Sequence, residues 1–104
     1  MITVVYSIRD VQTDTFAPPF LAATVGELDR MMLQSLEQES MLSRFPSDYA
    51  VYRIGEFDTS NGKMMPDDVP ELHSQVQAYV SLIYTRRLAA ERRQQQLFEE
   101  SSNE

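Results

Sequence analysis

The chain has 104 residues, a formal net charge of −7 and no cysteine, and 42% of its residues are hydrophobic. This length suits one domain with a real core, and the lack of cysteine excludes disulfides and thiolate chemistry. No apolar run approaches the ~20 residues of a membrane-spanning helix, so no membrane partner is expected. Because an acidic protein attracts phosphates poorly, protein partners are favoured unless basic residues cluster locally.

The first predicted element is a β-strand over residues 2–10. Its residues alternate, so that Ile2, Val4, Tyr6 and Ile8 fall on one face. A period of two with β-branched residues is typical of a strand that is buried on one side. This apolar set is the expected core face.

The segment 16–23 is apolar but contains Pro18 and Pro19. Proline cannot donate a hydrogen bond to a neighbouring strand, so it is confined to edge strands and bulges. We expect a short, interrupted edge strand with Phe20 and Leu21 facing inward. A docking role for the two prolines is the less favoured alternative, because prolines also protect sheet edges against aggregation.

A helix is predicted from Thr24 to about Glu39. Thr24 and Glu27 have the spacing of a capping box, in which the hydroxyl and the carboxylate each accept an amide hydrogen bond. Apolar residues then recur at helical spacing: Val25, Leu28, Met32 and Leu36. A short turn containing Met41, Leu42 and Phe45 is expected to fold back over the core before Pro46.

Residues 49–57 are predicted to form a central strand, because apolar side chains lie on both of its faces. Gly55 inside this run indicates a bulge or a close backbone approach. The following Asn61-Gly62 is a strong hairpin signal. It should return the chain through a short partner strand at 63–65, which Pro66 ends.

The last predicted element is a long helix from Pro70 to residue 98, preceded by acidic residues that suit a helix N-terminus. At 1.5 Å per residue it would be roughly 43 Å long, which exceeds the diameter of a domain this small. Its distal half is therefore expected either to project into solvent or to pack on a second copy. The simpler expectation is a homodimer formed through apolar residues at heptad-like spacing: Leu72, Val76, Tyr79, Val80 and Ile83.

Together these elements predict an α+β fold: a small antiparallel sheet in ββαββ order, one packed helix and a long C-terminal helix. The expected organisation is a core domain over residues 1–68, the helix over 69–98 as an oligomerisation element, and a disordered tail over 99–104.

No residue pattern indicates catalysis. His73 is the only histidine, and without a second histidine or a cysteine it is expected to be a surface residue rather than a metal ligand. The acidic residues near it, Asp67, Asp68 and Glu71, are better explained as a helix cap than as a cation site. Nucleophile-elbow and phosphate-binding glycine motifs are absent. The chain is predicted to be non-enzymatic, without cofactor or metal.

The second sheet face leaves two alternatives open. If the strands are neighbours, Val5, Ser7 and Arg9 would lie near a second set of side chains: Tyr49, Val51, Arg53 and Phe57. Aromatic and arginine side chains on a sheet can bind single-stranded nucleic acid. Cover by the C-terminal helix is the favoured alternative, because the surroundings are acidic.

Several segments resemble a known family. They are Y-S-I-R-D near the start, P-P-F, F-P-S-D-Y, and V-Y-R-I-G-E-F-D followed by N-G-K. Over roughly residues 4–70 the chain resembles the small non-structural protein of gokushovirus-type microviruses, which are bacteriophages with single-stranded DNA. The resemblance is sharpest over residues 52–58, with Asn61, Gly62 and Lys63 behind them.

The resemblance implies a DNA-binding accessory protein that acts in genome replication or in the switch to packaging. It further implies a location in the cytoplasm of the infected bacterium and absence from the virion. The expected DNA-binding residues are Arg86, Arg87, Arg92 and Arg93, with Arg9 and Arg53 second. The competing interpretation is an adaptor that recruits a viral or host replication or packaging protein without touching DNA.

Overall fold

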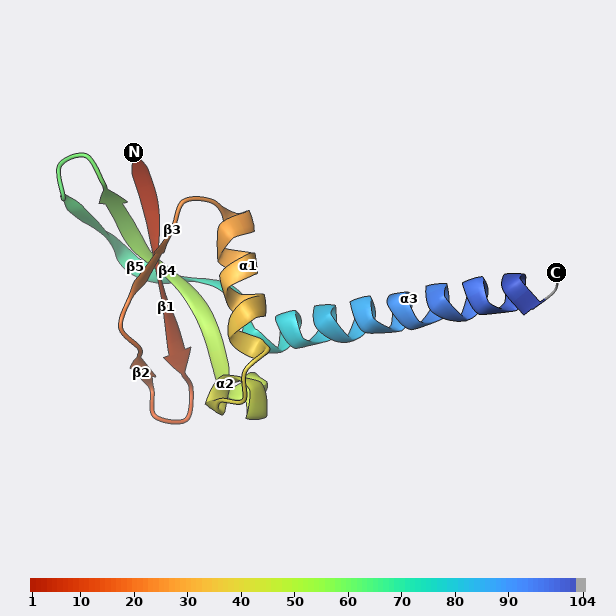
Figure 1. The fold of residues 1–104 in the computed structure, drawn as a ribbon. Coiled ribbons are helices and arrows are strands. Elements are labelled where there is room, and N and C mark those ends of the chain that lie inside the picture. Colours follow the sequence, from red (N-terminus) through yellow and green to blue (C-terminus); the bar gives the residue numbers. More distant parts are fainter. Residues whose placement is uncertain (103–104) are drawn as a thin grey trace.

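The computed structural model describes residues 1–102 and has the predicted α+β architecture, with an antiparallel sheet, one packed helix and a long helix that leaves the sheet (Figure 1). The elements follow the order β1 (Ile2–Asp10), β2 (Thr15–Phe16), β3 (Phe20–Ala22), α1 (Val25–Leu36), α2 (Met41–Arg44), a 3-10 turn (Pro46–Asp48), β4 (Tyr49–Asp58), β5 (Met64–Gln75) and α3 (Val76–Ser102). The predicted fold class is therefore confirmed.

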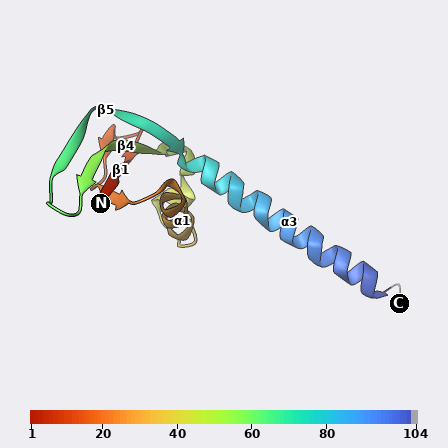
Figure 2. The same ribbon diagram turned by 90° about the horizontal axis from the view of Figure 1, so that it is seen from above.

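The sheet is organised around β1 and β4. Its strand order is β2-β1-β4-β5, and β3 pairs with β1 on the same side as β2. All of these pairings are antiparallel. The sheet curls, and β5 arches over its neighbours when the molecule is seen from above (Figure 2). Helix α1 packs inside this curl, where the core forms.

The predicted interrupted edge strand is present as β2 and β3, which are separated by Pro18 and Pro19. The Ser7 hydroxyl, which is almost fully buried, donates to the carbonyl of Ala17 at 2.7 Å and holds the interruption against β1. One inward residue was predicted wrongly. Leu21 is 40% exposed, whereas Ala22 is buried, because strand alternation places Phe20 and Ala22 on the same face.

Helix α1 begins as its capping box predicts. The Glu27 amide donates to the Thr24 hydroxyl at 3.1 Å, and the Glu27 carboxylate accepts from the Ala23 amide. The helix ends at Leu36, three residues before the predicted end. Its buried side chains, Leu28 and Met32, meet the core face of the sheet. Buried residues from β1, β3, β4 and α3 complete this core: Tyr6, Ala22, Val51, Val76 and Tyr79.

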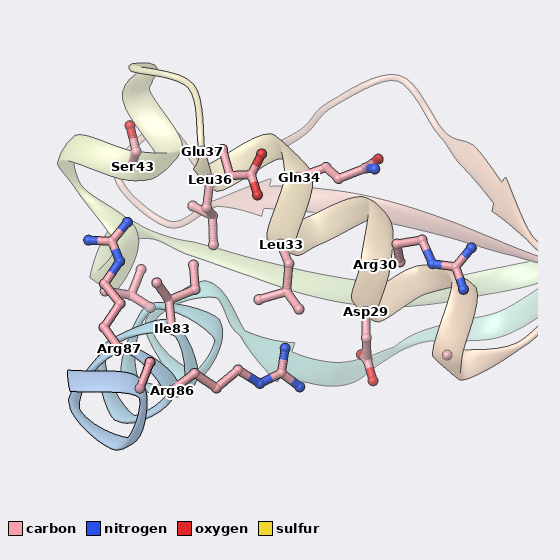
Figure 3. Close-up of a pocket in the computed structure, with 13 residues that line it drawn as sticks. Asp29, Arg30, Leu33, Gln34, Leu36, Glu37, Ser43, Ile83, Arg86 and Arg87 are labelled. Carbon is pink, nitrogen blue, oxygen red and sulfur yellow. The ribbon is translucent and has the colours of Figure 1, made fainter. Parts of the chain in front are cut away.

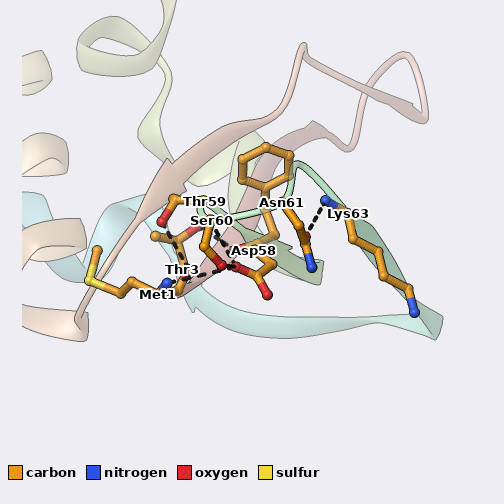
Figure 4. A network of polar contacts seen from close by, with 8 residues as sticks. Met1, Thr3, Asp58, Thr59, Ser60, Asn61 and Lys63 are labelled. Carbon is orange, nitrogen blue, oxygen red and sulfur yellow. Dashed lines mark hydrogen bonds and ion pairs between the residues drawn. The ribbon is translucent and has the colours of Figure 1, made fainter.

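The hairpin turn between β4 and β5 forms where Asn61-Gly62 predicts it, and Gly62 adopts a positive φ of 76°. Asp58 fixes this turn (Figure 4). It accepts from the Ser60 amide and hydroxyl, and lies 3.7 Å from the N-terminal amine of Met1. The Ser60 hydrogen bonds lower the pKa of Asp58 below its ordinary value. This carboxylate therefore has a structural role in the turn.

Strand β5 is longer than predicted, because Pro66 does not end it. The strand continues to Gln75 as the edge of the sheet. Its register with β4 jumps from Gly55 opposite Pro66 to Arg53 opposite Glu71. Edge positions and bulges tolerate proline, since no ladder hydrogen bond is required from it.

The predicted start of the C-terminal helix at Pro70 was wrong, since α3 begins at Val76. Residues 67–71 belong to β5, where Asp67 forms an ion pair with Arg53 at 3.3 Å. Pairing with β4 continues to Ala50 opposite Gln75, and this long-range ladder overrides the local helix-start signal. At the other end, residues 99–102 of the predicted disordered tail are helical, and residues 103–104 lie outside the described part.

Helix α3 gives the molecule its shape. Its 27 residues span about 40 Å, and the molecule measures 63 × 35 × 20 Å. The radius of gyration is 18.2 Å, whereas a compact domain of this length has about 13 Å. Only the first turns of α3 pack on the body. Over residues 1–102, no helix is long and apolar enough to cross a membrane.

The first turn of α3 is tied to α1 by a hydrogen bond. The Tyr79 hydroxyl donates to Asp29 Oδ1 at 2.8 Å, and the tyrosine side chain is 6% exposed. Burial, together with this carboxylate, raises the pKa of Tyr79 to about 12. The neutral form of Tyr79 is therefore favoured in the folded state.

Replacing Tyr79 by phenylalanine should cost about 1–2 kcal/mol at neutral pH, because a hydrogen bond to a carboxylate is lost. In the wild type, the contribution of Tyr79 is complete below pH 10 and is lost as the pH rises from 10 to about 12. Urea unfolding at pH 7 and pH 11 tests this. The difference between the two proteins should shrink at the higher pH, and an unchanged difference would contradict the assignment.

Candidate nucleic-acid interface on helix α3

Four arginines lie together on the part of α3 that leaves the body: Arg86, Arg87, Arg92 and Arg93. All four are exposed, and within residues 1–102 no carboxylate forms an ion pair with any of them. Residues 82–98 hold these four arginines and one glutamate, a sum of +3, whereas residues 1–75 hold five basic and twelve acidic residues, a sum of −7. The helix is thus a local cationic surface on an acidic protein.

The structure places Arg9 and Arg53 differently. Arg9 forms an ion pair with Asp14, and its guanidinium lies 6.0 Å from the ring centre of Tyr52. Arg53 is held by Glu56 at 2.7 Å and by Asp67 at 3.3 Å. The Arg53 pKa is raised, chiefly by the Glu56 hydrogen bond. Both side chains are engaged within the chain, and their charges are largely compensated there.

The side chains predicted to share the second sheet face were wrong, because the register between β1 and β4 differs from the one assumed. β1 pairs with β4 so that Tyr6 lies opposite Arg53 and Ile8 opposite Val51. Tyr49 and Val51 therefore share the core face with Tyr6 and Ile8, instead of lying beside Val5, Ser7 and Arg9. The pairing of β1 with β4 shifts by one residue after Val5, so strict alternation along the sequence does not show which side chains share a face. Val51 packs in the core with Leu28 and Met32 of α1 and with Val76 and Tyr79 of α3, and Tyr49 packs partly buried against this core.

Two of the five residues predicted at a dimer interface belong to the core of the single chain. Val76 is fully buried and Tyr79 is 6% exposed. Leu72 lies on β5, where it is 49% exposed, rather than on the helix. Val80 and Ile83 remain on α3 and are half-buried. Only these last two stay available on the helix to a second molecule.

A groove of about 880 Å³ separates α1 from α3 where the two helices diverge (Figure 3). Its floor is apolar and its rim is charged. Leu33, Leu36, Val80, Ile83 and Ala90 form the floor, and Asp29, Arg30, Glu37, Arg86 and Arg87 form the rim. Arg86 extends toward the Asp29 side of the groove and Arg87 toward the Ser43 side. The groove thus combines hydrophobic contact area with two of the four cluster arginines.

Tyr84 lies on the cationic stretch of α3 outside the groove lining, and the residues predicted from the sequence did not include it. It is 64% exposed and precedes Arg87 by three residues, so the two side chains are neighbours along α3. An exposed aromatic ring beside an arginine can stack on an unpaired base while the guanidinium binds a phosphate. Its signal in the sequence was an aromatic residue two positions before an arginine pair.

The remaining candidates for chemistry have structural explanations. His73 is exposed on β5, and its ring packs edge-on against Tyr6 with centres 5.7 Å apart. Asp67 serves the Arg53 ion pair. In the described part of the chain, no three metal-ligating side chains come together.

The arrangement defines a small α+β protein whose distinctive surface is the cationic stretch of a long C-terminal helix. Residues 3–79 match the family described as Phage ORF5 protein, and the chain belongs to this family. The match ends at Tyr79, so the cationic part of α3 lies beyond it. No curated protein and no solved structure matches the chain.

Proposed function

We propose that this phage protein is a non-enzymatic accessory protein of a microvirus that binds single-stranded DNA through α3. It acts in genome replication or in the switch to packaging, in the cytoplasm of the infected bacterium and outside the virion. The role and the location rest on the resemblance of residues 4–70 to the small non-structural protein of gokushovirus-type microviruses. Membership of the Phage ORF5 protein family supports the phage origin.

The observation that carries DNA binding is the uncompensated charge of the cluster Arg86, Arg87, Arg92 and Arg93. The arginines of the sheet are paired with neighbouring carboxylates, whereas no carboxylate of the described residues forms an ion pair with these four. Arg86 and Arg87 line the groove, and Arg92 and Arg93 lie further along the part of α3 that leaves the body. Separation matters because the body, with a charge of −7 over residues 1–75 from five basic and twelve acidic groups, repels phosphates. Screening limits that repulsion to about 10 Å at 0.1 M salt, so the distal turns escape it.

Binding of a labelled 20-nucleotide single strand should therefore be strongly dependent on salt. Each phosphate contact on a single strand contributes about 0.7 to the slope of log K against log salt, so four contacts give a slope of about −3. Fluorescence anisotropy between 20 and 200 mM salt measures this slope. The double variant R92A/R93A should reduce its magnitude by about 1.4.

A matched control is the double variant R44A/K63A, which removes two exposed cationic side chains from the body, outside the groove. Its slope should equal that of the wild type. Y84A should weaken binding by about 1–3 kcal/mol while leaving the slope unchanged, because base stacking is not ionic. Absence of binding by the wild type at tens of micromolar protein in low salt would refute the proposal.

The alternative is an adaptor that recruits a viral or host protein, and one observation favours it. A hollow of about 390 Å³ lies beside the interrupted edge strand, lined in part by Phe16, Ala17, Met41 and Leu42. Phe16 and Met41 are 45% and 57% exposed. A pull-down from infected cells, with and without nuclease, separates the two functions. A partner that survives both nuclease and high salt and is lost in F16A/M41A would favour the adaptor.

A further inference from the structure

The distal part of α3 has apolar side chains that its own chain does not cover. Residues 89–100 are all exposed, and Leu97 and Phe98 are 59% and 74% exposed. A helix that packs on nothing is marginal in water, since most helix stability in proteins comes from burial of an apolar face. This segment therefore needs a partner surface.

Four apolar residues of α3 lie on one line from the core to the tip: Val76, Ile83, Ala90 and Leu97 are separated by seven residues each. Positions seven apart lie on the same side of a helix, as one of the two seam positions of a coiled coil does. The other seam position is held by Tyr79, Arg86 and Arg93. Val76 is buried in the body and Ile83 lines the groove, so two of the four apolar residues already contact the rest of their own chain.

The groove between α1 and α3 fits a second copy of this same segment. On α3, the groove is lined by residues between Val80 and Ala90, and the uncovered stretch runs from Ala90 to residue 100. If two antiparallel α3 helices are related by a two-fold axis at Ala90, the uncovered stretch of each copy lies against the groove-lining stretch of the other. The numbers of two facing residues then sum to 180, so that Leu97 of one copy faces Ile83 of the other.

Side-chain size agrees with this arrangement, because Ala90, at the axis, is small enough to let two helices approach closely. The same register sets Arg87 of each copy opposite Arg93 of the other, a repulsion that salt screens. An isologous pairing also closes after two copies, because each chain supplies one tip and one groove.

We propose that the protein is an antiparallel homodimer in which the distal α3 of each copy occupies the α1–α3 groove of the other. This corrects the interface expected from the sequence: Ile83, Ala90 and Leu97 form the seam, whereas Val76 and Tyr79 belong to the core. The inference does not depend on DNA binding. Where the proposed function also holds, the dimer gathers the arginine clusters of both copies around its axis.

The absence of cysteine makes a direct test available. Single-cysteine variants A90C, L97C and Q95C are purified and exposed to mild oxidation without DNA. In the antiparallel dimer, A90C forms a disulfide with its own copy. L97C does not, because the two Leu97 positions lie about 21 Å apart along the axis. Q95C is on the opposite side of the helix and is the matched control for random collision.

A mixture of I83C and L97C should form mixed disulfides, and the uncrosslinked wild type should have twice the 12.0 kDa chain mass in light scattering. Self-crosslinking of L97C would indicate a parallel pair and overturn the proposal, as would A90C crosslinking no faster than Q95C. Since no DNA is present, crosslinking by A90C in a protein that fails to bind DNA would refute the proposed function alone.

Discussion

Replacing Gly55 by alanine is expected to destabilise the protein by about 2 kcal/mol or more, the range of overpacking in a closed structure. A Cβ atom at this position would lie 2.7 Å from the carbonyl oxygen of Met65 and 3.1 Å from Cα of Pro66. Both of these neighbours are backbone of the paired strand β5, which cannot move aside as a flexible side chain can. Relief therefore requires the β4–β5 ladder to shift.

Gly26 offers the matched control, because the same substitution there meets no obstacle. The nearest atom to an added Cβ is the Thr24 hydroxyl oxygen at 3.8 Å, an ordinary contact. Alanine in the first turns of α1 should stabilise by about 0.4–1 kcal/mol, since it restricts the unfolded chain. Urea midpoints of the two variants should thus move in opposite directions. A G55A midpoint at or above that of the wild type would show that the close approach carries no energetic weight.

The features that the sequence predicts correctly depend on neighbours along the chain. Thr24 caps Glu27 three residues later, and Asn61-Gly62 needs only its own backbone conformation to make a turn. Gly55 indicates a bulge or a close backbone approach, and the structure has both, because the register shifts between Arg53 and Gly55 and the backbone of Met65 lies close by. The sequence could not show which strand approaches, since Met65 meets Gly55 only through the register of β5.

The errors come from contacts between distant residues. The acidic run before Pro70 has the composition of a helix start, but Asp67 finds Arg53 across the sheet and the chain stays extended. In the same way, the sequence indicates Arg9 and Arg53 as nucleic-acid ligands, whereas in the fold Asp14 and Glu56 form ion pairs with them. The position of the four-arginine cluster on α3 could be predicted, because the arrangement of exposed residues on a helix depends on their spacing along the sequence and not on tertiary pairing.

Replacing Val76 by aspartate is expected to destabilise the single chain, which distinguishes the packing of α3 on its own body from its association with a second copy. Val76 is fully buried among core residues of its own chain, so a carboxylate there would be desolvated without a partner. We expect a loss of at least about 3 kcal/mol. Unfolding should be measured by circular dichroism in urea at low protein concentration, so that association between copies contributes little.

The matched substitution L97D lies three heptads further along the same line of apolar residues, at a position that is 59% exposed. It should change the unfolding free energy of the single chain by less than about 0.5 kcal/mol and should abolish the dimer in light scattering, because the charge would enter the apolar groove of the partner. If V76D has the urea midpoint of the wild type, α3 packs on the body more loosely than the burial of Val76 indicates, and the whole helix would be available to a second copy. The packing of Val76 and Tyr79 predicts the opposite: the first turns of α3 stabilise the single chain, and only the distal turns bind a second copy.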